Sequence, residues 1–339
     1  MKIISLFCGC GGLDLGFHMA GHEIVYANDF DKDSIETYKK NFDTSNCVIE
    51  HKSIIDVNIN NIPDGDIVIG GFPCQGFSVA NIYRNEEDDR NKLYLELLRV
   101  IKGKNPKFFL AENVTGLCSL GGYKNDFDKS KKLGKIFKMI LNDFRKIGYD
   151  VEWKILNSSD YGVPQNRKRV IIVGIRNDLK YKYIFPKIKF INKKTVRDAI
   201  GDLPIEYSQN IPNHHGSKYK VKINGYLGNR HIEWDKPAPT ITGRGGGTGG
   251  PIIMPHPSQE RRMTVREYAR IQTFPDNFIF EGSISSQYRQ IGNAVPPLMG
   301  IEIGKQFNKL EVKKEKEIIT DSFQISLFNL RGKELVLTN

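Results

Sequence analysis

Residues 2–12 read KIISLFCGCGG, an apolar run that breaks into a glycine-rich turn. The run has the length and composition of a buried strand, and a helical pattern follows from about Leu13 to Ala20. Glycines at a strand-to-helix turn let the backbone approach a ligand and leave N–H groups free at the helix start. The turn lacks the GxGxxG dinucleotide fingerprint and a Walker lysine. By itself it fits a ligand-binding turn or a tight turn with no ligand.

Outward from this stretch, short apolar runs alternate with helical patterns. Strands are predicted over residues 24–27, 66–70, 107–111 and 170–175, and helices up to about residue 41 and over 131–147. Alternation of this kind predicts an α/β fold with a doubly wound, mostly parallel sheet. From residue 186 to 282 glycine, proline, histidine and basic residues dominate, which indicates a smaller, loop-rich lobe. Helical pattern resumes at residues 264–272 and 298–309.

The predicted domains are a catalytic and cofactor-binding part over residues 1–185, the second lobe over 186–282, a return to the first part over 283–310, and a charged linker with a tail over 311–339. Hydrophobic residues make up 39% and charged residues 26% of the 339, which suits a globular core. The net charge of +11 favours polyanionic partners, although lysine is abundant throughout.

The five cysteines are an odd number, and neither a signal peptide nor a run of transmembrane length accompanies them. We therefore expect reduced thiols, a cytoplasmic location and no membrane association. Cys8 and Cys10 have no second pair at ligand spacing, so no metal is expected.

Reactive side chains follow the predicted strands. Asp29, after the second strand, is placed to accept hydrogen bonds from a ribose, or else to cap a helix. Cys74 lies in GGFPCQGFS after the strand DIVIG, where a thiolate is accessible, or else is a structural thiol. Glu112 follows KFFLA and suits an acid whose proton is held by partial burial, or a surface salt bridge. Arg167 and Arg169, in QNRKR, suit a grip on a base carbonyl or phosphates.

Taken in order, the motifs FxGxGG (7–12), PCQ (73–75), ENV (112–114), QxRxR (165–169) and GNxVxP (292–297) resemble the series of the DNA (cytosine-5)-methyltransferases. The chain is most similar to the bacterial or phage modification enzymes of restriction systems. The resemblance implies a Rossmann-like S-adenosylmethionine-dependent methyltransferase fold with a smaller target-recognition lobe. It implies methyl transfer from S-adenosylmethionine to carbon 5 of a cytosine flipped out of a short duplex sequence, through a covalent adduct.

Carried over by position, the resemblance makes Cys74 the nucleophile and Glu112 the acid, with Arg167 and Arg169 holding the cytosine and a phosphate. The cofactor would contact Phe7, Gly9, Cys10, Gly11, Gly12, Asp29, Phe30, Asp56, Pro73, Leu93, Asn293 and Val295. DNA would contact Gln75, Ser78, Arg84, Arg230, Thr240 and Arg244. The chain departs from the family at two positions. The family usually has Asp where Ser5 stands and often Glu where Asp29 stands, and both differences bear on the affinity for the cofactor.

Three other interpretations remain: the same chemistry on tRNA, a DNA-binding homologue without catalysis, and an NAD-dependent oxidoreductase. Duplex DNA is the expected partner and the protein is expected to be a monomer. A cognate restriction endonuclease would share the site without needing to bind this chain. Gln324–Phe328 (QISLF) resembles a sliding-clamp docking peptide, although an edge strand or packing tail is the simpler interpretation.

Overall fold

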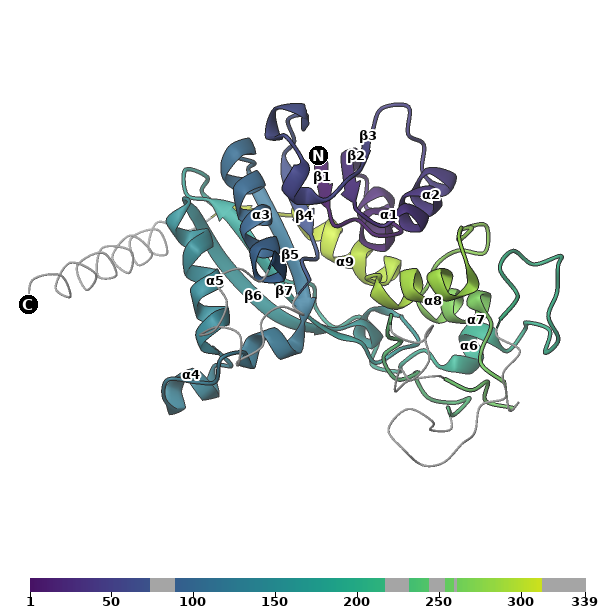
Figure 1. Cartoon of the computed structure of the whole chain (residues 1–339). Helices are drawn as coiled ribbons and strands as arrows, with labels where there is room; N and C mark the ends of the chain where they lie inside the picture. The colour runs from purple at the N-terminus through teal and green to yellow at the C-terminus, as the bar shows by residue number, and fades with distance from the viewer. Residues whose placement is uncertain (74–88, 217–231, 244–253, 259–260, 313–339) are drawn as a thin grey trace, which may run out of the picture.

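The structure is a computed structural model of the chain, and it describes residues 1–73, 89–216, 232–243, 254–258 and 261–312. It confirms the predicted α/β architecture, with a mixed sheet between two layers of helices and a smaller lobe beside them (Figure 1).

The main sheet has seven strands in the order β3-β2-β1-β4-β5-β7-β6. β7 runs antiparallel to both of its neighbours, and the pairs among β1 to β5 are parallel. The strands are β1 Lys2–Leu6, β2 Glu23–Asp29, β3 Val48–His51, β4 Ile67–Gly70, β5 Phe108–Val114, β6 Tyr149–Asn157 and β7 Lys168–Arg176. All five predicted strands are present, whereas β3 and β6 were not predicted.

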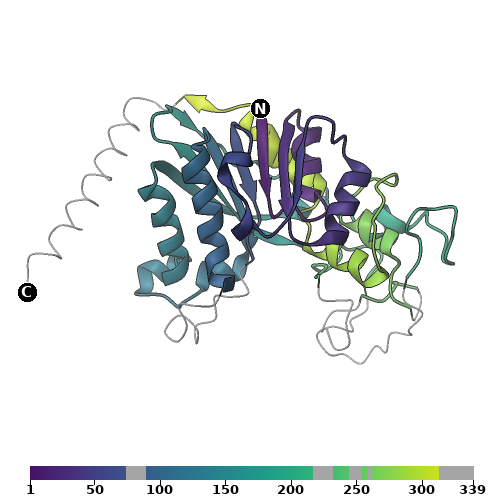
Figure 2. The same cartoon turned by 45° about the horizontal axis from the view of Figure 1, so that its top comes forward.

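Helices cover both faces of the sheet (Figure 2). Apolar side chains of α3 and α5 pack on one face, and those of α1 and α9 pack on the other. The helices are α1 Gly12–Met19, α2 Lys32–Asn41, α3 Asp89–Lys104, α4 Asp126–Ser130, α5 Lys135–Lys146, α6 Val196–Ile200, α7 Val265–Ile271, α8 Ile284–Asn293 and α9 Pro297–Phe307. Short 3-10 turns and a two-stranded pair, β8 Tyr181–Lys182 with β9 Glu311–Val312, complete the main domain.

The helix predicted over residues 131–147 begins later, at Lys135. Lys132 has a φ of 55°, a left-handed conformation that a helix does not accommodate, and Gly134 is the N-cap. The beginning of the predicted helix was therefore wrong by four residues, while its end was correct to one residue.

The last helix of the fold packs against the first. A Cβ atom added to Gly16 would lie 2.6 Å from the Cα of Gly300, so α1 and α9 approach backbone to backbone at two glycines. The Asn308 side chain donates to the carbonyl of Ala20 at 2.9 Å, which fixes the far end of the same contact. The C-terminal third of the chain thus supports the glycine turn that begins α1.

The smaller lobe has its own apolar core, to which α6, α7 and α8 contribute. Tyr288 and Ile291 of α8 belong to this core, whereas Met299 and Ile303 of α9 belong to the core beneath the sheet. The domain boundaries drawn from the sequence stay a prediction.

Candidate active site

The turn between β1 and α1 has a backbone that few residues adopt. Gly9 and Gly11 have φ values of 54° and 86°, which glycine adopts without strain. Phe7 has a φ of 53°, an uncommon conformation for a bulky residue and one that clusters at ligand sites. The expected ligand-binding turn therefore carries local strain at the aromatic residue assigned to the cofactor.

Asp29 closes this turn from the neighbouring strand. Its Oδ2 accepts the N–H of Gly9 at 2.8 Å and its Oδ1 accepts the N–H of Asp31 at 2.9 Å. Burial raises the pKa of Asp29, and these two backbone donors act against that rise. Since a carboxylate oxygen has two lone pairs, each oxygen keeps one for a further donor such as a ribose hydroxyl.

The surface beside the turn is open and carries an exposed aromatic ring. Phe30, next to Asp29, is 70% exposed. A Cβ atom added to Gly9 would have no heavy atom of the described chain within 4 Å. An exposed ring and open space beside a carboxylate match the needs of a nucleoside, whose base needs an apolar surface and whose ribose needs an acceptor.

The remaining predicted cofactor residues lie in different surroundings. Gly12 packs tightly on the C-terminal turn, since a Cβ atom there would lie 2.5 Å from the carbonyl oxygen of Val295. The Cys10 side chain is buried and donates to the Gln290 carbonyl of α8 at 3.6 Å, so only its backbone remains for a ligand. Asp56 and Asn293 are exposed, and Pro73 and Leu93 are half-buried.

Ser5 stands where the family usually has an aspartate, and the buried carboxylate of Asp14 lies beside it. The Oγ of Ser5 donates to Asp14 Oδ1 at 2.8 Å, and the Tyr38 hydroxyl donates to Asp14 Oδ2 at 2.8 Å. Burial raises the pKa of Asp14 to about 6, although both hydroxyl donors act to lower it. A carboxylate is thus present under the glycine turn, supplied by α1 instead of β1.

Glu112 and Arg169 meet near the carboxyl edge of the sheet. Arg169 Nε lies 2.8 Å from Glu112 Oε1, and both side chains are about nine-tenths buried. The Arg169 Nη1 also donates to the Lys168 carbonyl at 2.8 Å. Since the pair is buried, the surface salt bridge considered for Glu112 is excluded.

The strand segment before Cys74 lies against this pair. The Asn113 side chain donates to the Phe72 carbonyl at 2.8 Å. A Cβ atom added to Gly71 would lie 2.9 Å from Glu112 Oε2. The ENV segment and the beginning of the GFPC segment are therefore in contact at Gly71 and Phe72, close to residue 73, the last one described before the cysteine.

Arg167 has a different environment from the one expected. It is 1% exposed, and its guanidinium donates to the carbonyls of Ile241 at 2.7 Å, Gly292 at 2.9 Å and Asn293 at 3.3 Å. Burial lowers the pKa of Arg167 well below the usual value for arginine. Its Nη1 and Nη2 groups join the backbone at Ile241 to the end of α8 instead of facing an open site.

Two glutamines that sequence reasoning did not assign continue this joint. Gln165 accepts the N–H of Ile241 at 3.0 Å and donates to Gln272 at 2.9 Å. Gln272 in turn donates to the Ile291 carbonyl at 2.6 Å. The half-buried Thr240 donates its hydroxyl to the Asn166 carbonyl at 2.7 Å, so its side chain ties the segment before Ile241 to the QNRKR motif. The first position of QxRxR was the only sequence signal for Gln165.

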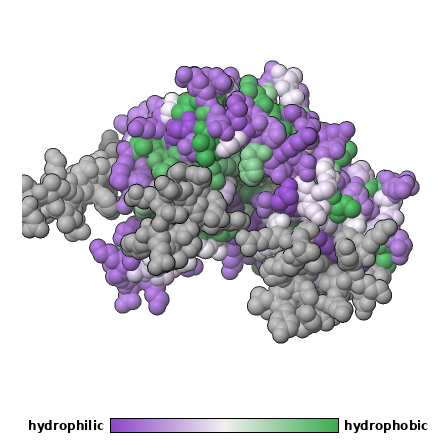
Figure 3. Space-filling view, in the orientation of Figure 1, coloured by the Kyte–Doolittle hydropathy of each residue, from purple (hydrophilic) through white to green (hydrophobic). Residues whose placement is uncertain are grey.

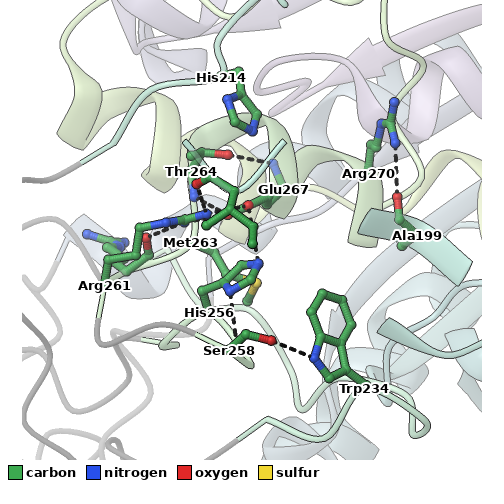
Figure 4. A network of polar contacts seen from close by, with 12 residues as sticks. Ala199, His214, Trp234, His256, Ser258, Arg261, Met263, Thr264, Glu267 and Arg270 are labelled. Carbon is green, nitrogen blue, oxygen red and sulfur yellow. Dashed lines mark hydrogen bonds and ion pairs between the residues drawn. The ribbon is translucent and has the colours of Figure 1, made fainter. Parts of the chain in front are cut away.

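A buried carboxylate organises the smaller lobe around α7 (Figure 4). Glu267 is 1% exposed and accepts two hydrogen bonds from Arg261, each 2.9 Å long, and one from the Thr264 N–H at 2.6 Å. His256 Nε2 lies 3.7 Å from the same carboxylate, and burial lowers the pKa of His256. The network fastens the segment before α7 to the first turn of that helix.

Several predicted site residues lie outside the described residues: Cys74, Gln75, Ser78, Arg84, Arg230, Arg244 and the peptide Gln324–Phe328. Among the residues that are described, no three histidine, cysteine or acidic side chains are grouped as a metal site would require. Within the same ranges, every helix is too short or too polar to span a membrane.

Comparison with solved structures puts this architecture among the methyltransferases. A prophage-encoded protein of E. coli named as a DNA modification methyltransferase superposes with a TM-score of 0.70 at 26% identity, covering 91% of this chain and 99% of its own. The S. pombe Dnmt2 methyltransferase superposes with a TM-score of 0.65 at 21% identity, covering 91% and 98%, and supports the fold alone.

The sequence comparisons are more specific. The type II methyltransferase M.MthTI of Methanothermobacter thermautotrophicus is 40% identical over 91% of this chain and 97% of its own. M.NgoFVII of Neisseria gonorrhoeae is 36% identical over 98% and 95%. Residues 1–309 match the C-5 cytosine-specific DNA methylase family, so the chain belongs to this family and is a DNA cytosine-5-methyltransferase of the restriction-modification type.

Proposed function

We propose that this enzyme transfers a methyl group from S-adenosylmethionine to carbon 5 of a cytosine flipped out of a short, specific duplex sequence, with Cys74 as the covalent nucleophile. The observation that supports this most directly is the buried Glu112–Arg169 pair, against which the segment leading to Cys74 is packed. The Glu112 carboxyl, the Arg169 guanidinium and the segment that leads to Cys74 lie together at one edge of the sheet.

Carbon 5 of cytosine is a weak nucleophile, and covalent addition at carbon 6 activates it. The Cys74 thiolate forms a bond to carbon 6 while Glu112 gives a proton to ring nitrogen 3, so an electron pair becomes available at carbon 5. Carbon 5 then takes the methyl group from the sulfonium of S-adenosylmethionine, which would leave as an uncharged thioether. A base removes the carbon 5 proton, the returning electron pair expels the thiolate, and Glu112 takes back the proton from ring nitrogen 3. The reacting carbons are inaccessible inside a duplex, so the base must leave the stack.

Arg169 has two tasks in this proposal. Its Nε forms an ion pair with the Glu112 carboxyl, whose Oε1 has no hydrogen-bond partner among the described residues, and its remaining N–H groups are suited to the carbonyl oxygen of the bound base. Arg167 is a positioning residue, because its guanidinium is bonded to three backbone carbonyls in two segments around the site, that of Ile241 and the end of α8.

S-adenosylmethionine, when bound, supplies an electrophilic methyl group. We assign Asp29 to the ribose hydroxyls, Phe30 and Phe7 to the adenine ring, and Asp56 to its amino group. The open space beside Gly9 and the exposed Phe30 ring support this assignment. The other proposed cofactor contacts are Gly9, Cys10, Gly11, Gly12, Pro73, Leu93, Asn293 and Val295. A reduced Cys74 thiol requires a reducing compartment, which supports a cytoplasmic location.

The nucleophile is tested with Cys74→Ala and with duplex DNA that carries 5-fluorocytosine. Because fluorine does not leave carbon 5 as a proton does, the wild-type enzyme should accumulate a denaturant-resistant protein–DNA adduct. The alanine variant should form none and should transfer no methyl group, while it still binds DNA. Cys47→Ala, which changes a half-buried cysteine outside the proposed site, is the matched control and should behave as wild type.

Bisulfite sequencing of plasmid DNA from an expressing host identifies the methylated sequence. A parallel incubation with tRNA and labelled cofactor tests the RNA alternative. Turnover by the Cys74→Ala variant at a tenth of the normal rate would contradict the nucleophile assignment, and label in tRNA but not in DNA would contradict the substrate.

A further inference from the structure

Residues 123–133, between the 3-10 turn Thr115–Ser119 and α5, form a closed projection from the main domain, here called the α4 projection. Backbone hydrogen bonds join its two ends: Gly134 N–H to the Cys118 carbonyl at 2.8 Å and Lys135 N–H to the Gly122 carbonyl at 2.9 Å. The projection is thus a defined element with a fixed base.

The projection is also ordered internally. The Asn125 side chain caps the first turn of α4 by accepting the Asp128 N–H at 2.8 Å. Asp128 is 1% exposed, and its carboxylate pairs with Lys138 of α5 at 3.0 Å. This ion pair fastens α4 to α5 and removes one of the two acidic groups of the segment from its surface.

The exposed charge of the projection is strongly positive. Asp126 is its one exposed carboxylate, against the exposed lysines Lys124, Lys129, Lys131 and Lys132, with Lys135 at the base. In the part of the chain that the structure describes, no carboxylate pairs with these lysines. Phe127 is 66% exposed among them, and the Lys131 ammonium lies 6.0 Å from its ring centroid. Lysines without counter-charges around an exposed aromatic ring match a surface that contacts a polyanion.

The position of the projection identifies the polyanion. β5, which carries Glu112, leads through the turn Thr115–Ser119 directly into the projection, so both lie toward the carboxyl edge of the sheet. Figure 1 shows α4 projecting at the lower left and the smaller lobe at the lower right, on either side of the lower ends of the central strands. The same lower-left region is hydrophilic in Figure 3. A duplex held by the smaller lobe and directed at Glu112 would extend toward α4.

We infer that the α4 projection binds the phosphate backbone of the DNA that flanks the recognition sequence. This inference rests on the proposed function, because it takes the duplex to be the substrate. Ammonium groups bind phosphates without reading bases, so the contact would add affinity and fix the direction of the duplex without changing the methylated sequence.

The test compares two double variants that each remove two exposed lysines. Lys129→Gln with Lys131→Gln removes charge from the projection. Lys102→Gln with Lys180→Gln removes charge from the opposite, amino-terminal edge of the sheet and is the matched control. Binding of a cognate duplex with long flanks is measured as a function of salt concentration, after melting curves confirm that both variants are folded.

The projection variant should lower the slope of log K against log salt by about 1 for each lysine, and weaken binding about tenfold or more near 0.1 M salt. The control should keep the wild-type slope. A short duplex without flanks should bind the projection variant as it binds wild type, and bisulfite sequencing should give the same methylated sequence.

Two results would overturn the inference while methylation by the wild-type enzyme continues. One is an unchanged salt slope in the projection variant, and the other is an equal loss of affinity for the short and the long duplex. Failure of the proposed function is separate, because the wild-type enzyme would then methylate no duplex at all, whatever the lysine variants do.

Discussion

Arg169 reaches Glu112, at 2.8 Å, because β7 runs against β5. In an antiparallel pair the beginning of one strand lies beside the end of the other, and Arg169 is paired with Val114 in the register of the two strands. A parallel β7 would put its first residues at the opposite edge of the sheet. The reversal of this one strand therefore supplies an arginine to the edge where the carboxyl ends of the other strands gather.

Glu112→Gln should lower kcat by about 10² to 10⁴-fold, the usual contribution of a general acid. Glutamine keeps an oxygen for Arg169 but has no carboxyl proton to give to ring nitrogen 3. Single-turnover methyl transfer at saturating DNA and cofactor measures this effect, with Glu302→Gln, a half-buried carboxylate of α9 that pairs with Lys189, as the control. A variant that keeps a third of the wild-type rate would refute the assignment.

Arg167→Met should lower the free energy of unfolding by about 3 kcal/mol, because buried carbonyls lose their donors. Arg167→Lys should recover part of the loss, since an ammonium cannot span three carbonyls as a guanidinium does. Urea unfolding gives the stability. A positioning role also predicts that cofactor affinity falls more than the single-turnover rate, because Gly292 and Asn293 are held by this side chain. A variant with wild-type stability would contradict this account.

The buried Asp14 should make stability depend on pH. Its pKa is raised from the ordinary 3.8 to about 6, so the folded state holds the proton to higher pH than the unfolded chain does. The stability that protonation contributes is present below about pH 4 and is lost as the pH rises through about 6, by about 3 kcal/mol in all.

Asp14→Asn removes this titration and keeps the shape of the side chain. The difference in unfolding free energy between wild type and variant, measured in urea at several values between pH 4 and 7.5, should shift in favour of the variant as the pH rises. Groups far from Asp14 titrate equally in both proteins and cancel in this difference, whereas Asp29 is coupled to Asp14 through their charges. A difference that is constant across this range would show that Asp14 does not titrate there.

Glu267→Ala should cost about 3–5 kcal/mol, since it leaves the Arg261 guanidinium half-buried without its carboxylate. The smaller lobe should lose its order around α7, so that DNA affinity falls while cofactor affinity is retained. Differential scanning calorimetry with separate titrations of cofactor and duplex distinguishes these effects. Glu267→Gln, which keeps one acceptor, should be intermediate, and equal losses of both affinities would place the damage outside the lobe.

The elements that the sequence predicted well are those with continuous apolar runs. KFFLA and VIIVGI are buried on both faces of the sheet, and such runs predict strands without reference to their neighbours. The direction of β7 was not predictable, because burial on both faces indicates a central strand and says nothing of its polarity. β6 was missed although its apolar residues alternate with Glu152 and Lys154, the pattern of a half-buried edge strand, so the sequence did contain a signal for it.

The types of residue at the site were predictable from the sequence, but the contacts between them were less so. Glu112 and Arg169 were expected at the same edge, but their ion pair follows from strand register, which a single sequence does not contain. Arg167 and Arg169 are two positions apart in one motif, yet one reaches the smaller lobe and the other the carboxylate. Their separate roles depend on Ile241 and Gly292, which come from distant parts of the chain.

The contact between Gly16 and Gly300 also has a consequence for how the protein is made. A ribosome delivers β1, α1 and the residues of the glycine turn early, and α9 only after nearly 300 residues. Until then the face of the sheet that holds Ile3 and Phe17 has no α9 to cover it, so the growing chain must keep this apolar surface from aggregation. Contacts between such distant segments also form slowly. During translation, the side chains proposed for catalysis are therefore made many seconds before the enzyme can become active.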